Sequence, residues 1–199
     1  MTHSTTELNA LIGSRICHDL ISPLGAIGNG VELLSMSGVT AAPEITLISE
    51  SVENANARIR FFRVAFGAAS KEAQIGHSEV TRVLSDLYRG NRIRVDWRIS
   101  GDTLRLETKL VFLLIQCFES ALPWGGKVVV TRTGDTWSIY GSADRMKVQQ
   151  ELWDRFESGD DGAEIVPSNV HFALVKLTAD AIGRSAKASV SEAAISVSF

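Results

Sequence analysis

The chain has 199 residues, of which 45% are apolar and 22% are charged, and its formal net charge is −3 at pH 7. This composition is typical of a globular protein with one large domain or two small ones. Nucleic acids and anionic membranes usually bind a basic excess that this chain lacks, so we expect neither as a partner.

The first residues contain no basic cluster followed by an apolar run, and no apolar stretch reaches the roughly 18 residues that a membrane span needs. Cys17 and Cys117 match no metal or redox spacing, so reduced thiols are expected. His3, His77 and His171 have no paired ligand spacing. The sequence therefore predicts a cytoplasmic protein with no metal or cofactor of its own.

A first long helix is expected from about residue 5 to about residue 35. Thr5 or Thr6 can cap its free backbone N–H groups. Its apolar stripe consists of Leu8, Ile12, Ile16, Leu20, Ile27, Val31 and Leu34. A Ser-Gly pair at 37–38 interrupts the pattern, and Pro43 then occupies the first turn of a second helix, where its missing N–H costs nothing.

The second helix carries apolar residues at alternating three- and four-residue steps for about three heptads. They are Ile45, Ile48, Val52, Ala55, Ile59, Phe62 and Phe66. Two helices alone bury too little apolar surface to be stable, and Leu47, Phe61 and Val64 lie off the main seam. We therefore predict that residues 1–71 form a helical hairpin, which pairs with a second copy in a dimeric four-helix bundle.

From about residue 72 the pattern changes to alternating helices and strands. Helices are expected after a cap at Ser78 and at 107–122, 143–156 and 170–182, and strands at 92–99, 127–132, 136–140, 187–190 and 195–199. Thr-Gly-Asp at 133–135 is a hairpin turn signal. The sequence thus predicts an α+β protein in which residues 72–199 form an α/β sandwich, with a mixed sheet and helices on one face.

Residues 18–24 read His-Asp-Leu-Ile-Ser-Pro-Leu and lie inside the first helix. Helical periodicity places His18 almost opposite the centre of the apolar stripe, so we expect it at the surface. The residues that share its face are mostly small, namely Ser14, Ile21, Ser22, Gly25 and Asn29. Such a face lets another protein approach closely, whereas a surface histidine without a role is the simpler alternative.

The neighbours of His18 indicate phosphoryl chemistry on histidine. Asp19 can polarise one ring nitrogen while the other attacks phosphorus, and such transfer depends mainly on positioning and charge stabilisation. Ser22 lies one turn on and can donate a hydrogen bond to the phosphoryl group, although ordinary surface polarity explains it equally well. Pro23 removes one backbone hydrogen bond and predicts a bend in the helix.

The second helix contributes to the same surface. In an antiparallel hairpin that turns near residue 38, His18 lies level with residues 58–62. We therefore expect Arg58 or Phe61 to border the surface on which a partner docks. A dyad of Cys17 and His18 is not expected, because adjacent side chains on a helix point in different directions.

The stretch at 18–24 is similar to the H-box of sensor histidine kinases. In that motif a histidine and an acidic residue are followed by two variable positions, a small polar residue and Pro-Leu. The resemblance implies that His18 is the phospho-acceptor, Asp19 the assisting carboxylate and Ser22 the small polar residue.

The sequence departs from these kinases where they bind ATP. Ser120 stands where the resemblance expects a magnesium-binding asparagine, and Gly141-Ser142-Ala143-Asp144 replaces the adenine-binding box. No later Gly-x-Gly precedes the helix expected at 170–182. We therefore expect that the nucleotide site is lost.

An H-box hairpin followed by a decayed ATPase-like domain resembles the alphaproteobacterial histidine phosphotransferases of the ChpT type, as do the stretches at 25–30, 60–67 and 125–126. The resemblance implies a homodimer that relays phosphoryl groups, through a phospho-histidine, between receiver domains of a hybrid histidine kinase and of response regulators. The receiver is expected to supply Mg²⁺. Two alternatives remain: an ATP-dependent sensor histidine kinase core and a non-catalytic dimerisation scaffold.

Overall fold

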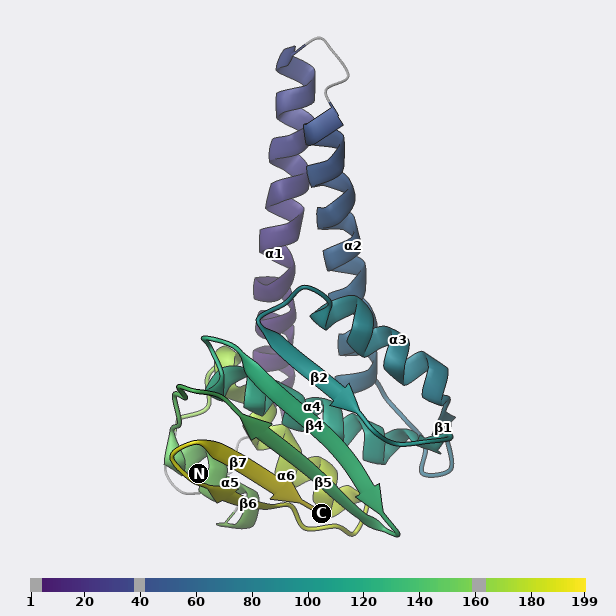
Figure 1. Cartoon of the computed structure of the whole chain (residues 1–199), viewed down its shortest axis with the longest axis vertical. Helices are drawn as coiled ribbons and strands as arrows, with labels where there is room; N and C mark the ends of the chain where they lie inside the picture. The colour runs from purple at the N-terminus through teal and green to yellow at the C-terminus, as the bar shows by residue number, and fades with distance from the viewer. Residues whose placement is uncertain (1–4, 38–41, 159–163) are drawn as a thin grey trace.

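The structure is a computed structural model and describes residues 5–37, 42–158 and 164–199 (Figure 1). Helices α1 (Thr5–Ser37) and α2 (Ala42–Ala65) form an antiparallel hairpin that projects from an α/β body. Both predicted long helices are confirmed. The predicted connection between them lies mostly outside the described residues. No helix in the described ranges is long and apolar enough to cross a bilayer.

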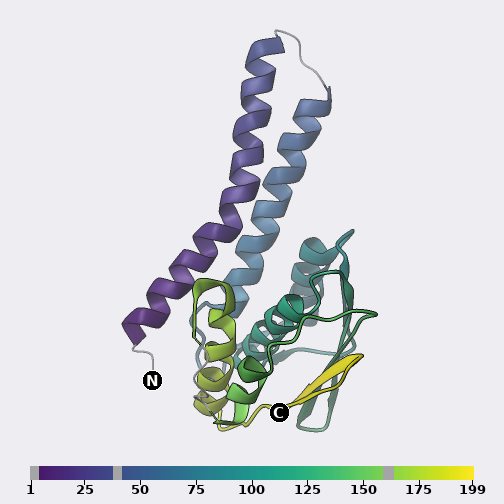
Figure 2. The ribbon, with the colours of Figure 1, turned by 90° about the vertical axis from the view of Figure 1, so that its left-hand side faces the viewer.

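Helix α1 contains an internal proline, Pro23. Figure 2 shows that α1 changes direction part-way along its length. A proline has no N–H to donate and its ring crowds the carbonyl four residues earlier, here that of Asp19, so a bend at this turn is expected. The bend therefore belongs to the part of the helix that carries His18 and Asp19.

The body is built on a mixed five-stranded sheet. Its strands are β2 (Ile93–Trp97), β4 (Gly126–Thr133), β5 (Thr136–Ser142), β6 (Lys187–Val190) and β7 (Ala194–Ser198), in the order β2-β4-β5-β7-β6. Strand β2 runs parallel to β4, and the other neighbours are antiparallel. Helices α4 (Arg105–Ala121), α5 (Gln150–Ser158) and α6 (Val170–Ala181) cover one face of this sheet (Figure 2). The predicted α+β fold with helices on one face is confirmed.

The β4–β5 hairpin closes as its turn signal predicts. Thr133 pairs with Thr136 across a two-residue loop. Gly134 takes the first loop position with φ +58°, a conformation that glycine adopts without steric cost.

Three short features of the body differ from the sequence expectation. Helix α3 (His77–Tyr88) begins one residue before Ser78, and its first N–H donates to Asp102 Oδ1 at 3.1 Å. Ser78 is therefore not the cap, because the capping carboxylate comes from a distant loop. Strands β1 (Gln74–Ile75) and β3 (Thr103–Leu104) form a small antiparallel pair that we did not predict.

Helix α5 begins at Gln150, seven residues later than expected. The preceding segment instead lies along the body, where Met146 and Val148 pack against the core. Its backbone is tied to the end of α4, since Lys147 N–H donates to the Ala121 carbonyl at 2.9 Å. This donor is therefore not available for an earlier helical turn.

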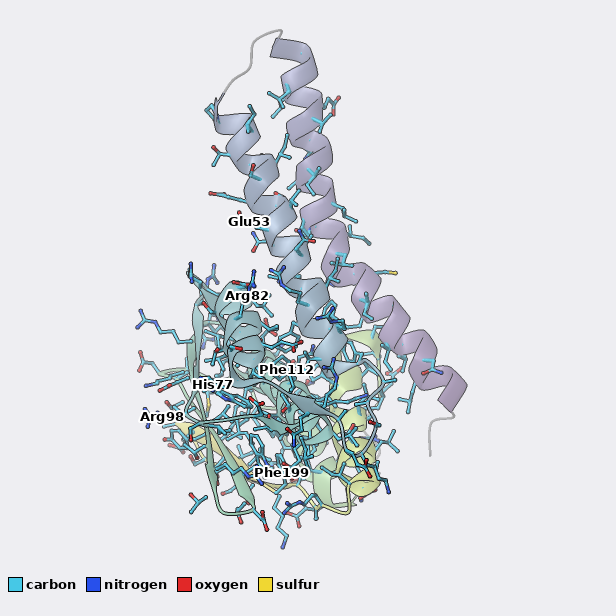
Figure 3. All side chains as sticks on the ribbon, turned by 90° about the vertical axis from the view of Figure 1, so that its right-hand side faces the viewer. Glu53, His77, Arg82, Arg98, Phe112 and Phe199 are labelled. Carbon is cyan, nitrogen blue, oxygen red and sulfur yellow. The ribbon has the colours of Figure 1, made fainter. Side chains whose placement is uncertain are left out.

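The base of the hairpin shares a core with the body. Helix α4 is buried on all sides between residues 110 and 118, where every residue except Gln116 is apolar. Phe61 of α2 stacks on Phe112 of α4 with ring centroids 4.8 Å apart, and its edge meets Tyr88 of α3. Figure 3 shows Phe112 inside the body. Phe61 and Val64 are thus covered within one chain, so they do not by themselves require a second copy.

Candidate functional site

His18 lies at the surface of α1, where its side chain is 83% exposed. The other residues predicted for its face, Ser14, Ile21, Gly25 and Asn29, are exposed as well. The orientation that helical periodicity predicts is therefore confirmed. A reactive group from outside can reach this imidazole without any opening of the fold.

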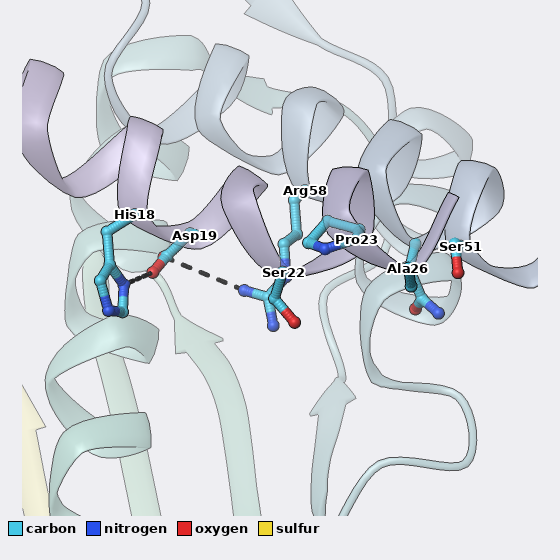
Figure 4. Close-up of a pocket in the computed structure, with 8 residues that line it drawn as sticks. His18, Asp19, Ser22, Pro23, Ala26, Ser51 and Arg58 are labelled. Atoms are coloured by element: carbon cyan, nitrogen blue, oxygen red, sulfur yellow. Dashed lines mark hydrogen bonds and ion pairs between the residues drawn. The ribbon is translucent and has the colours of Figure 1, made fainter. Parts of the chain in front are cut away.

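The imidazole is held by its neighbour in sequence. His18 Nδ1 lies 3.1 Å from Asp19 Oδ1 (Figure 4). An ionised carboxylate only accepts hydrogen bonds, so Nδ1 carries the proton in this contact and Nε2 carries the lone pair. The nitrogen that can attack phosphorus is therefore Nε2, on the far side of the ring from Asp19.

Asp19 is itself held by two arginines. Its side chain is 10% exposed, and Oδ2 accepts a hydrogen bond from Arg15 Nε at 2.8 Å. Arg58 of α2 approaches the same oxygen with Nη1 at 3.9 Å. The two carboxylate oxygens thus have different partners, since Oδ1 faces the imidazole and Oδ2 faces the guanidinium groups.

A groove of about 440 Å³ runs beside His18 between the two helices (Figure 4). It is lined by His18, Asp19, Ser22, Pro23 and Ala26 of α1 and by Ser51, Asn54 and Arg58 of α2. The predicted Ser22 and Arg58 therefore lie in one groove with the histidine. Ser51 and Asn54 were not singled out from the sequence, because nothing in their spacing distinguishes them from other polar residues of α2.

Phe61 does not lie on this surface. Its side chain is 1% exposed and packs on Phe112. Of the two residues proposed to border the docking surface, only Arg58 lies beside His18. Phe61 faces the opposite way because α2 packs against the body as well as against α1.

An acid from the body lies near the same two arginines. Glu119 of α4 is partly buried, and this burial raises its pKa, whereas the nearby charges of Arg58 and Arg15 lower it. Tyr88 Oη lies 3.5 Å from Glu119 Oε2, and burial raises the pKa of this phenol well above its usual value. Charged residues of the hairpin (Arg15, Asp19 and Arg58) and of the body (Glu119) therefore lie close together where these two parts of the chain meet.

The position expected to bind magnesium in kinases has internal partners here. Ser120 Oγ donates to the Gln116 carbonyl at 3.1 Å and lies 3.1 Å from His171 Nε2. Burial lowers the pKa of His171 to about 3, so this imidazole is neutral at neutral pH. Within the described ranges, no group of three or more His, Cys, Asp or Glu side chains is arranged to hold a metal ion.

Arg15 contacts Asp19 and was not singled out from the sequence. The spacing of Arg15 and Asp19 is a readable signal, because residues four apart on a helix lie on the same face. Nothing in the sequence indicates the second contact of Arg15. Its Nη1 donates to the backbone carbonyl of Ser168 at 2.7 Å, across 153 positions of the chain.

Comparisons with known proteins find similarity to phosphotransferases. A model of the family described as "Histidine phosphotransferase C-terminal domain" matches residues 77–194. The protein phosphotransferase ChpT of Brucella abortus (strain 2308) is 38% identical over 136 residues, which is 67% of this chain and 65% of that protein. A solved structure of a bacterial phosphotransferase superimposes with a TM-score of 0.84 at 30% identity, covering all of this chain and 98% of the other.

Proposed function

The chain belongs to the histidine phosphotransferase family, and from this premise we propose that it relays phosphoryl groups between receiver domains through a phospho-histidine at His18. The observation that carries the proposal is the exposed imidazole whose Nδ1 faces Asp19 and whose Nε2 faces solvent. No step requires ATP.

The reaction is written as a direct transfer. Nε2 of His18 attacks the phosphorus of a receiver's aspartyl phosphate, the P–O bond to the aspartate breaks, and its electron pair leaves with the receiver's carboxylate. Asp19 holds the proton on Nδ1 and balances the positive charge that develops on the ring. Attack by the aspartate of a second receiver reverses these steps, so His18 is returned unchanged.

We propose that receivers dock on the exposed stripe of α1 formed by Ser14, Ile21, Gly25 and Asn29, with Arg58 at its border. Most of these side chains are small, and Ile21 offers an exposed apolar anchor, 67% accessible. Ser22 lines the groove beside His18 and is assigned to hydrogen bonding with the phosphoryl group.

The proposed transfer also needs a metal ion and a cellular location. The Mg²⁺ that neutralises the phosphoryl oxygens belongs to the receiver. The protein acts in the cytoplasm, where thiols stay reduced, and both Cys17 and Cys117 are free thiols. The hairpin at 1–71 carries the chemistry, and residues 72–199 form a degenerate ATPase-like domain.

The proposal also includes a homodimer joined through the hairpins. Exposed apolar residues recur at seven-residue spacing on both helices: Leu24 and Val31 on α1, and Ile45, Val52 and Ile59 on α2. An apolar seam at this spacing is typical of helices that pack against further helices in a bundle. A second hairpin is the occupant that completes a four-helix bundle.

Two labelling reactions test the relay. The protein is incubated with radiolabelled ATP alone, and separately with a receiver domain phosphorylated on its aspartate by labelled acetyl phosphate. We expect label only from the receiver, on wild type but not on His18→Ala. His77→Ala removes another exposed histidine, on α3, and is expected to label like wild type.

The alternatives give different patterns. Label from ATP alone indicates a histidine kinase, and no label from either donor indicates a dimerisation scaffold. Label that persists in His18→Ala means that another residue carries the phosphoryl group, and it contradicts the assignment of His18.

A further inference from the structure

We propose that Arg15 is a positioning residue through which the α/β body holds the Asp19 carboxylate, and thereby the His18 imidazole, in the geometry for phosphoryl transfer. The inference rests on the proposed function. It assigns a role in catalysis to a part of the chain that carries no reacting group.

The guanidinium of Arg15 bridges two parts of the fold. Its Nε donates to Asp19 Oδ2 at 2.8 Å, and its Nη1 donates to the Ser168 carbonyl at 2.7 Å. The Arg15 side chain is only 16% exposed. Because the guanidinium is planar and its donors point in fixed directions, satisfying both acceptors restricts the position of each.

The carbonyl that accepts from Arg15 belongs to a well-anchored turn. Ser168 lies in the 3₁₀ helix η1 (Pro167–Asn169). The Asn169 side chain ties this turn to the segment before it: Oδ1 accepts from Val166 N–H at 2.8 Å, and Nδ2 donates to the Glu164 carbonyl at 3.0 Å. Helix α6 follows directly with Val170, which is buried. The body therefore offers Arg15 a fixed acceptor.

The other cation near Asp19 does not replace this bridge. Arg58 Nη1 is 3.9 Å from Oδ2, beyond hydrogen-bond distance. Without Arg15, Oδ2 keeps a nearby charge but loses its directional donor. The carboxylate can then rotate, and the contact from Oδ1 to His18 Nδ1 that selects the reactive tautomer is weakened.

The test uses Arg15→Gln in the full chain, with Arg63→Gln as the matched control. Arg63 also joins the hairpin to the body, through an ion pair to Glu79 of α3 at 3.5 Å, and it does not line the groove at His18. The rate of His18 phosphorylation is measured with two donors: phosphoramidate, which requires no docking, and a phosphorylated receiver. The ¹⁵N shifts of the His18 ring report its tautomer.

We expect Arg15→Gln to slow phosphorylation from both donors by roughly 10-fold, in line with the loss of a partner that orients a histidine elsewhere. The ¹⁵N shifts are expected to move toward the Nε2–H tautomer, and Arg63→Gln should change neither readout. In an Asp19→Asn background, Arg15→Gln should have no added effect, because both act on one contact.

Several outcomes would overturn the inference: an unchanged tautomer and rate, a slowing with the receiver alone, or a full additional loss in the Asp19→Asn background. Asn169→Ala provides a second route if Arg15→Gln disrupts folding, since it releases the turn that carries Ser168 and should shift the same signals in the same direction. If wild type takes no phosphate from the receiver, the proposed function fails, whereas the tautomer measurement still decides the role of Arg15.

Discussion

The two oxygens of Asp19 have different partners, with His18 on one side and arginines on the other. This division matters because an imidazole has two nitrogens, and only the unprotonated one is a nucleophile. A carboxylate beside Nδ1 selects Nε2 for attack. The two residues are neighbours in the sequence, but adjacency alone does not make helical side chains meet; Asp19 Oδ1 faces His18 while the arginines hold Oδ2.

His171, unlike the exposed His18, is a buried histidine with a structural contact. It is fully buried, its Nε2 lies 3.1 Å from Ser120 Oγ, and burial lowers its pKa to about 3. In the unfolded chain an ordinary histidine binds a proton near pH ~6.5. Between these two pH values the unfolded state binds more protons, so the free energy of unfolding falls as the pH falls.

We predict that His171→Gln reduces the acid sensitivity of the fold. Between pH 7 and pH 5 the wild-type protein should lose about 2 kcal/mol of stability through this one group, and the variant should lack that loss. Urea unfolding of both proteins at the two pH values measures the difference. Glu119 is present in both proteins, so its raised pKa, which acts in the opposite direction, cancels in the comparison. An equal decline in both proteins would contradict the assignment.

At the scale of elements, α2 has both buried faces and an exposed apolar face. Ala55 and Phe62 are buried, while Ile45, Val52 and Ile59 of the same predicted seam are exposed. A further face, with Phe61, is buried against α3 and α4. The single apolar seam read from the sequence is thus divided between contacts inside the chain and a surface that remains open.

We predict that Phe61→Ala costs about 3–5 kcal/mol in the free energy of unfolding, the usual range for removing a buried aromatic side chain. The variant removes a ring that stacks on Phe112 and joins the hairpin to the body. Denaturant unfolding measures the loss. Asn56→Ala, at an exposed position on the same helix, should change stability by less than about 0.5 kcal/mol. A comparably small loss in Phe61→Ala would show that the stacked contact does not stabilise the junction.

At the scale of the whole molecule, the hairpin contacts the body only at one end (Figure 1). Apolar side chains farther along the hairpin are exposed. The shared core at residues 61–65 and the Arg15 bridge both lie at this junction. The body can therefore serve the hairpin as a rigid support.

We predict that wild type has twice the chain mass in light scattering at micromolar concentration and that Val52→Asp shifts it toward the monomer. A carboxylate in the exposed stripe would have to be desolvated in a four-helix bundle. Asn9→Asp adds the same charge at an exposed polar position of α1 and should leave the mass unchanged. A monomeric wild type would contradict the homodimer.

The sequence predicted most of the fold because its signals are local. The 3.6-residue periodicity identified α1 and α2, and the glycine at 134 identified the β4–β5 turn. The start of α5 and the cap of α3 were wrong, since each depends on a hydrogen bond from another part of the body. Two-residue strands such as β1 and β3 have too few residues to show a period.

For the candidate site too, local features could be predicted from the sequence and long-range contacts could not. The sequence by itself determined that His18, Asp19 and Ser22 lie within one turn of each other and that His18 faces solvent, because helix geometry relates residues a few positions apart. Only the tertiary structure decided that Phe61 is buried and that Arg15 joins Asp19 to Ser168. Contacts between residues distant in the chain depend on how whole elements pack, which no local pattern specifies.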